Sequence, residues 1–218
     1  MTTLYLDRRD TRLKLDGRAL AIYTGEERRG TVPIQMLERI VMRTAVTLDS
    51  SLLAQLADAG VGIVAFGGRN ASKLAVVHGR SHNDGARRIG QYRLADDDAW
   101  RLAWTRRLVC GKLRRQQRLL AAALAERPDR RHPLHKAGAQ LDQARRRAAD
   151  PNTASVDTLR GIEGAAAAAY FGAYCQLFAP ELDFTGRNRR PPRDPVNAIL
   201  SLGYTLLHYD AVRACYGA

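Results

Sequence analysis

The chain has 218 residues, 45% of them hydrophobic, and 35 Lys and Arg against 22 Asp and Glu, which gives a formal charge of +13. The apolar content is sufficient for a folded core, which excludes an intrinsically disordered chain, and the positive excess favours a polyanionic partner such as nucleic acid. The three cysteines lack metal or disulfide spacing, and no apolar run approaches the roughly 20 residues that cross a bilayer. We therefore expect a cytoplasmic protein without a membrane partner.

Residues 1–80 show the two-residue periodicity of β-strands. Alternating apolar pairs recur at Leu13 and Leu15, Leu20 and Ile22, Ile40 and Met42, Val61 and Ile63, and Leu74 and Val76. Asp16-Gly17, between the first two pairs, indicates a hairpin turn of type I′, and Gly67 to Asn70 indicates another turn between strands. Residues 51–59 indicate one short helix capped by Asp49 or Ser50. This segment predicts a small β-sheet domain.

Residues 81–90 are polar and glycine-rich, and we interpret them as a linker, because the apolar periodicity changes across them from about 2 to about 3.6. Residues 91–218 predict an all-α domain. Its expected helices run over about 99–125, about 134–149, 155–178 and from Pro195 onward. The predicted fold class is α+β, with a small N-terminal β-sheet domain followed by a larger helical-bundle domain.

The helix expected over residues 99–125 carries seven cations and no acidic residue. The cations are Arg101, Arg106, Arg107, Lys112, Arg114, Arg115 and Arg118. Like charges on one helix repel each other unless an anion neutralises them. We predict that Arg107, Arg114, Arg115 and Arg118 contact DNA; the alternative is a solvated face without a ligand.

A second cationic cluster lies on the loop before the last helix. It consists of Arg187, Arg189, Arg190 and Arg193, stiffened by two prolines. Guanidinium groups and a helix N-terminus both favour phosphate oxygens, so this loop is a second predicted DNA contact. The alternative is that Arg193 pairs with Asp194 and the others are solvated.

Glu163 lies between Ile162 and Gly164 in a helix rich in small residues, where its neighbours suggest burial. A buried carboxylate needs a partner cation, a metal ion or a proton. From the residues alone, a structural ion pair is favoured over a metal ligand. Tyr170, Phe171 and Tyr174 could stack on unpaired bases, but their helical spacing in an apolar stretch is more typical of a core.

Two stretches are similar to motifs of the CRISPR-associated integrase of spacer acquisition. One is Leu159 to Gly164 with the Ala-rich sequence and Tyr170 after it, and the other runs from Arg190 to Tyr204. The resemblance covers essentially the whole chain. It implies a metal-dependent DNA endonuclease or integrase that inserts captured DNA into the CRISPR array by transesterification of a phosphodiester. Glu163 would be the catalytic carboxylate and first ligand of Mg²⁺ or Mn²⁺, and Asn197, Tyr204 and Tyr170 would form the wall of the site.

The resemblance also implies the partners: DNA with splayed ends, a homodimer joined through the β domains, and the small second CRISPR adaptation protein. Family members continue with a metal-binding His and a further acidic ligand that this sequence lacks, and His208 and Asp210 precede the positions expected for them. We therefore expect little or no nuclease activity from the chain alone. The alternative function is a non-catalytic DNA-binding or architectural module with an incomplete metal site.

Overall fold

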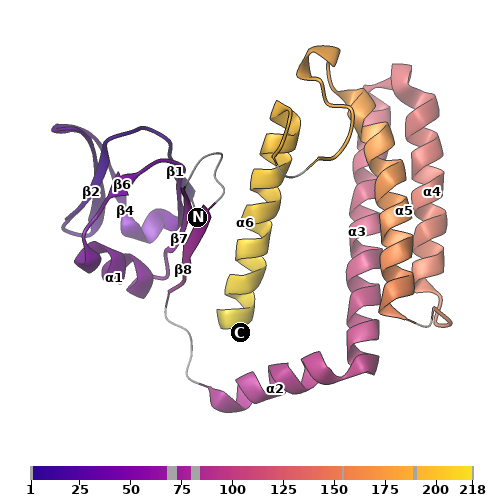
Figure 1. Cartoon of the computed structure of the whole chain (residues 1–218), viewed down its shortest axis with the longest axis horizontal. Helices are drawn as coiled ribbons and strands as arrows, with labels where there is room; N and C mark the ends of the chain where they lie inside the picture. Colours follow the sequence, from indigo (N-terminus) through magenta and orange to yellow (C-terminus); the bar gives the residue numbers. More distant parts are fainter. Residues whose placement is uncertain (1, 68–72, 80–83, 154, 189–190, 218) are drawn as a thin grey trace. The chain divides into compact units, whose positions relative to one another are not determined.

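The chain folds into two compact units, which are described separately (Figure 1). The computed structural model describes residues 2–67, 73–79, 84–153, 155–188 and 191–217. Unit 1 comprises residues 1–83 and 203–218, and unit 2 comprises residues 84–202. Strands occur in the first part of the chain and the rest is mostly helical, so the predicted α+β fold class is confirmed.

The described residues of unit 1 form two four-stranded sheets. The strands are β1 (Thr2–Leu6), β2 (Thr11–Asp16), β3 (Ala19–Thr24), β4 (Glu27–Pro33), β5 (Leu37–Met42), β6 (Val46–Thr47), β7 (Gly62–Gly67) and β8 (Lys73–Val77). One sheet has the order β1-β5-β7-β8, in which β1, β5 and β7 are parallel and β8 is antiparallel to β7. The other has the order β4-β3-β2-β6, in which only β6 pairs in parallel.

The hairpin between β2 and β3 differs in one detail from its prediction. Asp16 pairs with Ala19, so the two turn residues are Gly17 and Arg18 rather than Asp16 and Gly17. Gly17 has a φ of 60°, the sign that a type II′ turn requires at its first central residue. The hairpin is confirmed, whereas the expected type I′ register was displaced by one residue.

The core of unit 1 lies under helix α1 (Ser50–Asp58), which follows the predicted N-cap. The Asp49 carboxylate accepts a hydrogen bond of 2.7 Å from the backbone N–H of Leu52. Leu52 and Leu56, one helical turn apart, are fully buried. They join buried residues of both sheets, together with Val61 just before β7; the sheet residues are Leu6, Leu13, Leu20, Leu37, Ile40, Met42 and Ile63. The alternation that predicted the strands therefore also places part of each inner pair in this core, whereas Leu74 of β8 is exposed.

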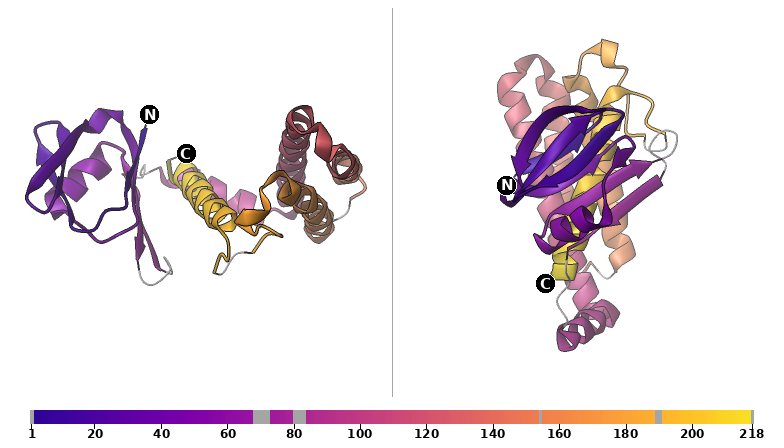
Figure 2. Two further views of the ribbon diagram at one scale, coloured as in Figure 1. Left: turned by 90° about the horizontal axis from the view of Figure 1, so that it is seen from above. Right: turned by 90° about the vertical axis from the view of Figure 1, so that its left-hand side faces the viewer.

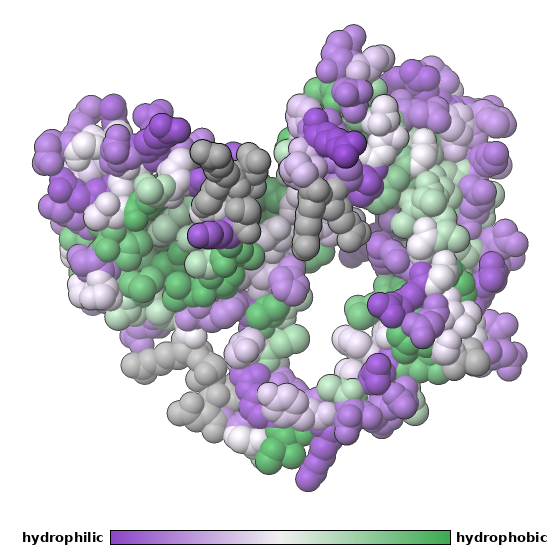
Figure 3. Space-filling model, viewed as in Figure 1, coloured by the Kyte–Doolittle hydropathy of each residue, from purple (hydrophilic) through white to green (hydrophobic). Residues whose placement is uncertain are grey.

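Unit 2 is a bundle of three long helices preceded by a shorter one. Its helices are α2 (Gly85–Asp96), α3 (Asp98–Glu126), α4 (Arg131–Ala149) and α5 (Val156–Tyr174), and α6 (Pro195–Gly217) begins in unit 2 and continues in unit 1. Figure 2 shows α3, α4 and α5 end-on as neighbours. Their shared core contains Val109, Leu113, Leu120, Leu134, Ala137, Leu141, Ala148, Leu159, Ile162, Ala166, Tyr170 and Ala173. Hydrophilic residues line the outer edge of α4 (Figure 3).

Four boundaries differ from those expected. Residues 85–90, expected in the linker, lie in α2, and residues 203–218 group with unit 1. Helix α4 begins at Arg131, earlier than predicted, because Pro133 falls in the first turn, where a helix does not need its N–H. Helix α5 ends at Tyr174 and is followed by a 3₁₀ turn, Cys175–Leu177. In the described part of the chain, no helix is long and apolar enough to cross a membrane.

Candidate nucleic-acid interface

Glu163 forms an ion pair with Lys112. The carboxylate comes from α5, directly after the buried Ile162, and the ammonium group comes from α3. The Glu163 side chain is 29% exposed and the Lys112 side chain 43%, so the pair lies at the surface of the bundle. The burial expected for Glu163 is therefore only partial, and the interpretation as an ion-pair member describes its observed contact.

A metal ion does not fit this arrangement as it stands. Mg²⁺ and Mn²⁺ take several oxygen ligands, but the described residues contain no group of three or more His, Cys, Asp or Glu side chains that could hold a metal. The Lys112 ammonium group also donates a hydrogen bond to the Glu163 carboxylate, where a metal ion would have to bind. Asp210 is engaged elsewhere, in an ion pair of 2.6 Å with Arg39 in unit 1. Glu163 alone among the described residues does not make a metal centre.

The seven cations of α3 fall into two groups. Arg101 pairs with Asp98 at 2.8 Å, Arg106 donates to the Thr153 carbonyl at 2.9 Å, and Lys112 pairs with Glu163. The four that were predicted to contact DNA are exposed, and within the described residues none of them makes an ion pair or a hydrogen bond; they are Arg107, Arg114, Arg115 and Arg118. Their contact with DNA stays a prediction, but their guanidinium groups are available for one.

The arginine loop before α6 is held together mainly by its own contacts. Arg187 donates to the Asn197 Oδ1 at 2.8 Å, to the Ser201 hydroxyl at 3.2 Å and to the Asn188 carbonyl. It is half-buried, so the structure gives it a role in shaping the loop. Arg193 is exposed, and no pair between it and Asp194 is present among the described residues. Arg189 and Arg190 lie outside the described residues.

Asn197 is the centre of this loop and is fully buried. Its Oδ1 accepts from Arg187 at 2.8 Å and from the Asn188 N–H at 3.0 Å, and its Nδ2 donates to the Gly186 carbonyl at 2.7 Å and to Asp194 at 2.6 Å. All the hydrogen-bonding capacity of its amide is thereby used on the loop. The predicted place of Asn197 in the wall of a site beside Glu163 stays a prediction.

Asp194 caps the start of α6. Its carboxylate accepts from the Asn197 N–H at 2.7 Å and from the Asn188 side chain at 3.2 Å. Burial of Asp194 opposes its charge, but the hydrogen bonds from Asn197 and Asn188 outweigh burial and lower the pKa of Asp194 below 3.8. The carboxylate is therefore an ionised cap and not a proton donor.

The two tyrosines expected beside Glu163 have different environments. Tyr170 is buried in the bundle core and stacks on Tyr174 with ring centroids 5.3 Å apart. Tyr204 is exposed and belongs to the part of α6 that groups with unit 1. The structure thus places Tyr170 in the core of the unit that contains Glu163, and the roles of both rings in a site wall stay predictions.

A model of the family described as CRISPR associated protein Cas1 matches residues 4–218 of this chain. The chain belongs to the Cas1 family. It is 34% identical over 220 residues to the CRISPR-associated endonuclease Cas1 1 of Thermodesulfovibrio yellowstonii, covering 98% of this chain and 66% of that protein. It therefore spans slightly less than two thirds of that curated relative.

Solved Cas1 structures share the fold. A Cas1 protein from Thermotoga maritima has a TM-score of 0.74 and 22% identity, over 99% of this chain and 65% of that one. A chain of a Cas6-RT-Cas1–Cas2 complex has a TM-score of 0.74 and 21% identity, over 95% of this chain and 22% of that one. Both likenesses concern the fold alone.

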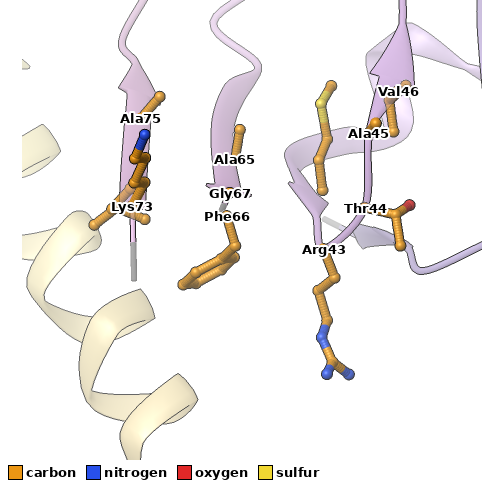
Figure 4. Close-up of a pocket in the computed structure, with 11 residues that line it drawn as sticks. Arg43, Thr44, Ala45, Val46, Ala65, Phe66, Gly67, Lys73 and Ala75 are labelled. Carbon is orange, nitrogen blue, oxygen red and sulfur yellow. The ribbon is translucent and has the colours of Figure 1, made fainter. Parts of the chain in front are cut away.

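This Cas1 chain also has a pocket in unit 1 that its sequence did not reveal (Figure 4). Its volume is about 510 Å³. Phe66 lies on β7, which is between β5 and β8 in the sheet. Arg43 directly follows β5, and Lys73 is the first residue of β8. None of its lining residues is a carboxylate, a histidine or a cysteine, so the pocket lacks the side chains that most often bind metal ions. Met42 and Ala65, which both line the pocket, pair between the parallel strands β5 and β7, and such a long-range pairing is not legible in local sequence.

Proposed function

We propose that this Cas1 chain acts in a DNA endonuclease or integrase that inserts captured DNA fragments into the CRISPR array. The family match across residues 4–218, which includes Glu163 in its motif, carries the proposal. In the reaction, the 3′-hydroxyl of a captured fragment attacks a phosphodiester of the array. One P–O bond forms, one P–O bond breaks, and the displaced strand leaves with a free 3′-hydroxyl.

DNA is the substrate that the electrostatics of unit 2 favour. Four exposed arginines of α3 lack a partner among the described residues, and residues 99–125 contain no carboxylate to neutralise them. Phosphates would relieve their mutual repulsion and release condensed counterions from the DNA. The charge of +13 over the whole chain supports the same class of ligand.

The proposed cofactor is Mg²⁺ or Mn²⁺, with Glu163 as one oxygen ligand. When bound, such an ion would polarise a phosphoryl oxygen and stabilise the departing one. The described residues do not complete its coordination, and Lys112 must release the carboxylate before an ion can bind it. We therefore propose that the residues described here have little or no nuclease activity by themselves.

The proposed partners are a second copy of the chain, joined through unit 1, and the small second CRISPR adaptation protein. The structural neighbour described as a Cas6-RT-Cas1–Cas2 complex supports a partner of the Cas2 type. We propose both contacts for this chain on the strength of the family resemblance.

A second candidate function is a DNA-binding module without catalysis. The observation that favours it is the ion pair between Lys112 and Glu163, because a carboxylate that serves only to hold a lysine needs no metal. The surface arginines would bind DNA equally well in either case.

The test joins residues 1–218 of this chain to the part of the Thermodesulfovibrio yellowstonii relative that lies outside the match, in the chain order of that relative. We expect the parent fusion to integrate a labelled DNA fragment in the presence of Mn²⁺. The Glu163→Gln variant should lose integration but keep a DNA affinity within about twofold of the parent. Arg160→Gln, on the exposed face of the same helix, is the matched control that should retain activity. Integration that survives Glu163→Gln would exclude the proposed role of this carboxylate. A parent protein that binds the DNA but integrates none of it would leave the binding module as the function.

A further inference from the structure

Two exposed tryptophans stack on each other at the start of α3. The rings of Trp100 and Trp104 have centroids 5.5 Å apart and an interplanar angle of 13°. Trp100 is 37% exposed and Trp104 is 45% exposed. A stacked pair of large rings at a surface is already ordered, so a third flat ring could extend the stack at little further entropic cost.

The tryptophans share a helix face with three of the arginines described above. Residues 100, 104, 107, 114 and 118 follow the spacing i, i+4, i+7, i+14 and i+18, which keeps them on one side of an α-helix. Val109, Leu113 and Leu120 are buried on the opposite side, in the bundle core. The rings therefore begin a strip that continues through Arg107, Arg114 and Arg118 for about 21 Å beyond Trp104, at 1.5 Å per residue.

The charge along this strip decides what can cover it. A protein surface that buried the tryptophans would also have to neutralise the arginines, because residues 99–125 contain no carboxylate. A single strand of DNA meets both requirements, since every base has a π-face and every nucleotide carries a phosphate. Duplex DNA presents its phosphates but keeps its base faces stacked inside, except at its ends.

We propose that this face of α3 binds an unpaired DNA strand, with bases stacked on Trp100 and Trp104 and phosphates on Arg107, Arg114 and Arg118. The site rests on the proposed function as a DNA-handling protein and adds to it a position where a strand without its complement is held. It requires neither Glu163 nor a metal ion.

The chain provides its own probe, because its sequence contains 2 tryptophans and both are in this site. Titration with oligo(dT) of about 16 nucleotides, within the range of known single-strand site sizes, should quench their fluorescence. A blunt duplex of the same length should bind through phosphates with much weaker quenching. Elevated salt should reverse both complexes.

Variants separate ring stacking from general apolar contact. The double change Trp100→Leu and Trp104→Leu should lower affinity for labelled oligo(dT) about tenfold to hundredfold, the loss expected for one or two stacked bases, with a far smaller effect on the duplex. The double change to Phe should restore most of the affinity. Leu108→Ala, which trims an exposed apolar side chain of the same helix, should leave it within about twofold.

Each alternative outcome has its own signature. If the duplex binds while oligo(dT) neither quenches nor loses affinity in the Leu variant, the stacking site is wrong and the DNA-handling function stands. If neither DNA binds at low salt, both proposals fail. If the tryptophan emission instead shifts to shorter wavelength as protein concentration rises, without DNA, a second copy covers the rings and the inference is wrong.

Discussion

Lys112 and Glu163 join α3 to α5 through an ion pair between the lysine ammonium and the glutamate carboxylate. The contact joins the Glu163 carboxylate to α3, the helix that carries the exposed arginines. It also gives that carboxylate a cation in the absence of any metal ion. Whether the pair is a structural necessity or an exchangeable contact is decided by its energy.

A double-mutant cycle with Lys112→Met and Glu163→Gln should give a coupling energy of about 1 kcal/mol or less. The reason is that both side chains are partly exposed, 43% and 29%, so water screens their attraction. Urea unfolding of the four proteins measures it. A coupling well above this value would mean that the pair is a fixed part of the bundle and that Glu163 is not available to other ligands.

The double change Arg114→Ala and Arg118→Ala should weaken duplex DNA binding and flatten its dependence on salt. If each guanidinium neutralises one phosphate, the slope of log K against log salt should fall by about 1 to 2. Fluorescence anisotropy over a salt series measures this slope. Arg101→Ala is the control on the same helix, since Arg101 is already paired with Asp98, and an equal effect in the control would remove the special role of the exposed pair.

Asn197→Ala should destabilise the chain by about 2 to 3 kcal/mol. The change leaves several hydrogen-bonding groups of the loop without their partner in a buried place, which is costly. Chemical unfolding monitored by circular dichroism gives the value. Ile199→Ala, at an exposed position of the same helix, should change the free energy of unfolding by no more than about 0.5 kcal/mol.

Asp194→Asn should destabilise the chain at neutral pH by an amount that shrinks in acid. The folded pKa of Asp194 lies below its ordinary value of 3.8, so its ionised form contributes stability that is complete above this value and is lost as pH falls through the folded pKa. The difference between parent and variant should therefore be constant from pH 7 to about pH 5 and decline below about pH 4. Urea unfolding across this range tests the sign, which would be wrong if the difference grew in acid.

Gly62→Ala should destabilise unit 1 by about 1 to 3 kcal/mol. A Cβ at this position of β7 would overlap the hydroxyl of Tyr209, which packs against the strand from the unit 1 part of α6. Hydrogen exchange should show the largest loss of protection in residues 203–217. Gly30→Ala in β4, where a Cβ meets nothing within 4 Å, is the control, and equal losses in both variants would contradict this packing.

Most of the helices and strands of this protein are predictable from its sequence, because their signals are local. Alternating pairs such as Leu13 and Leu15 predicted strands, and the uncompensated cations of residues 99–125 predicted a charged helix, which the structure has at Asp98–Glu126. The sequence motif around Glu163 indicated the family, which the family match confirms. Asp49 indicated the start of α1. Each of these depends on residues within a few positions of one another.

Helix α2 was not predicted because it buries no residue. Its sequence therefore lacks the apolar stripe with a period of about 3.6 residues that indicates an amphipathic helix. Its N-cap was nevertheless legible: the Asp84 carboxylate accepts from the Arg87 N–H at 3.0 Å. A cap three residues before a basic run was the signal that could have found it.

The partners of the charged groups follow from the tertiary structure and not from local sequence. Lys112 and Glu163 lie 51 positions apart, and Arg39 and Asp210 lie 171 apart, so no local pattern pairs them. The same holds for the hydrogen bond between Asn197 and Arg187, and for the parallel pairing of β1, β5 and β7. Charge and period specify what a segment can do, but the choice among many possible partners is made by the packing of the whole chain, which fixes the distances over which electrostatic and hydrogen-bonding forces act.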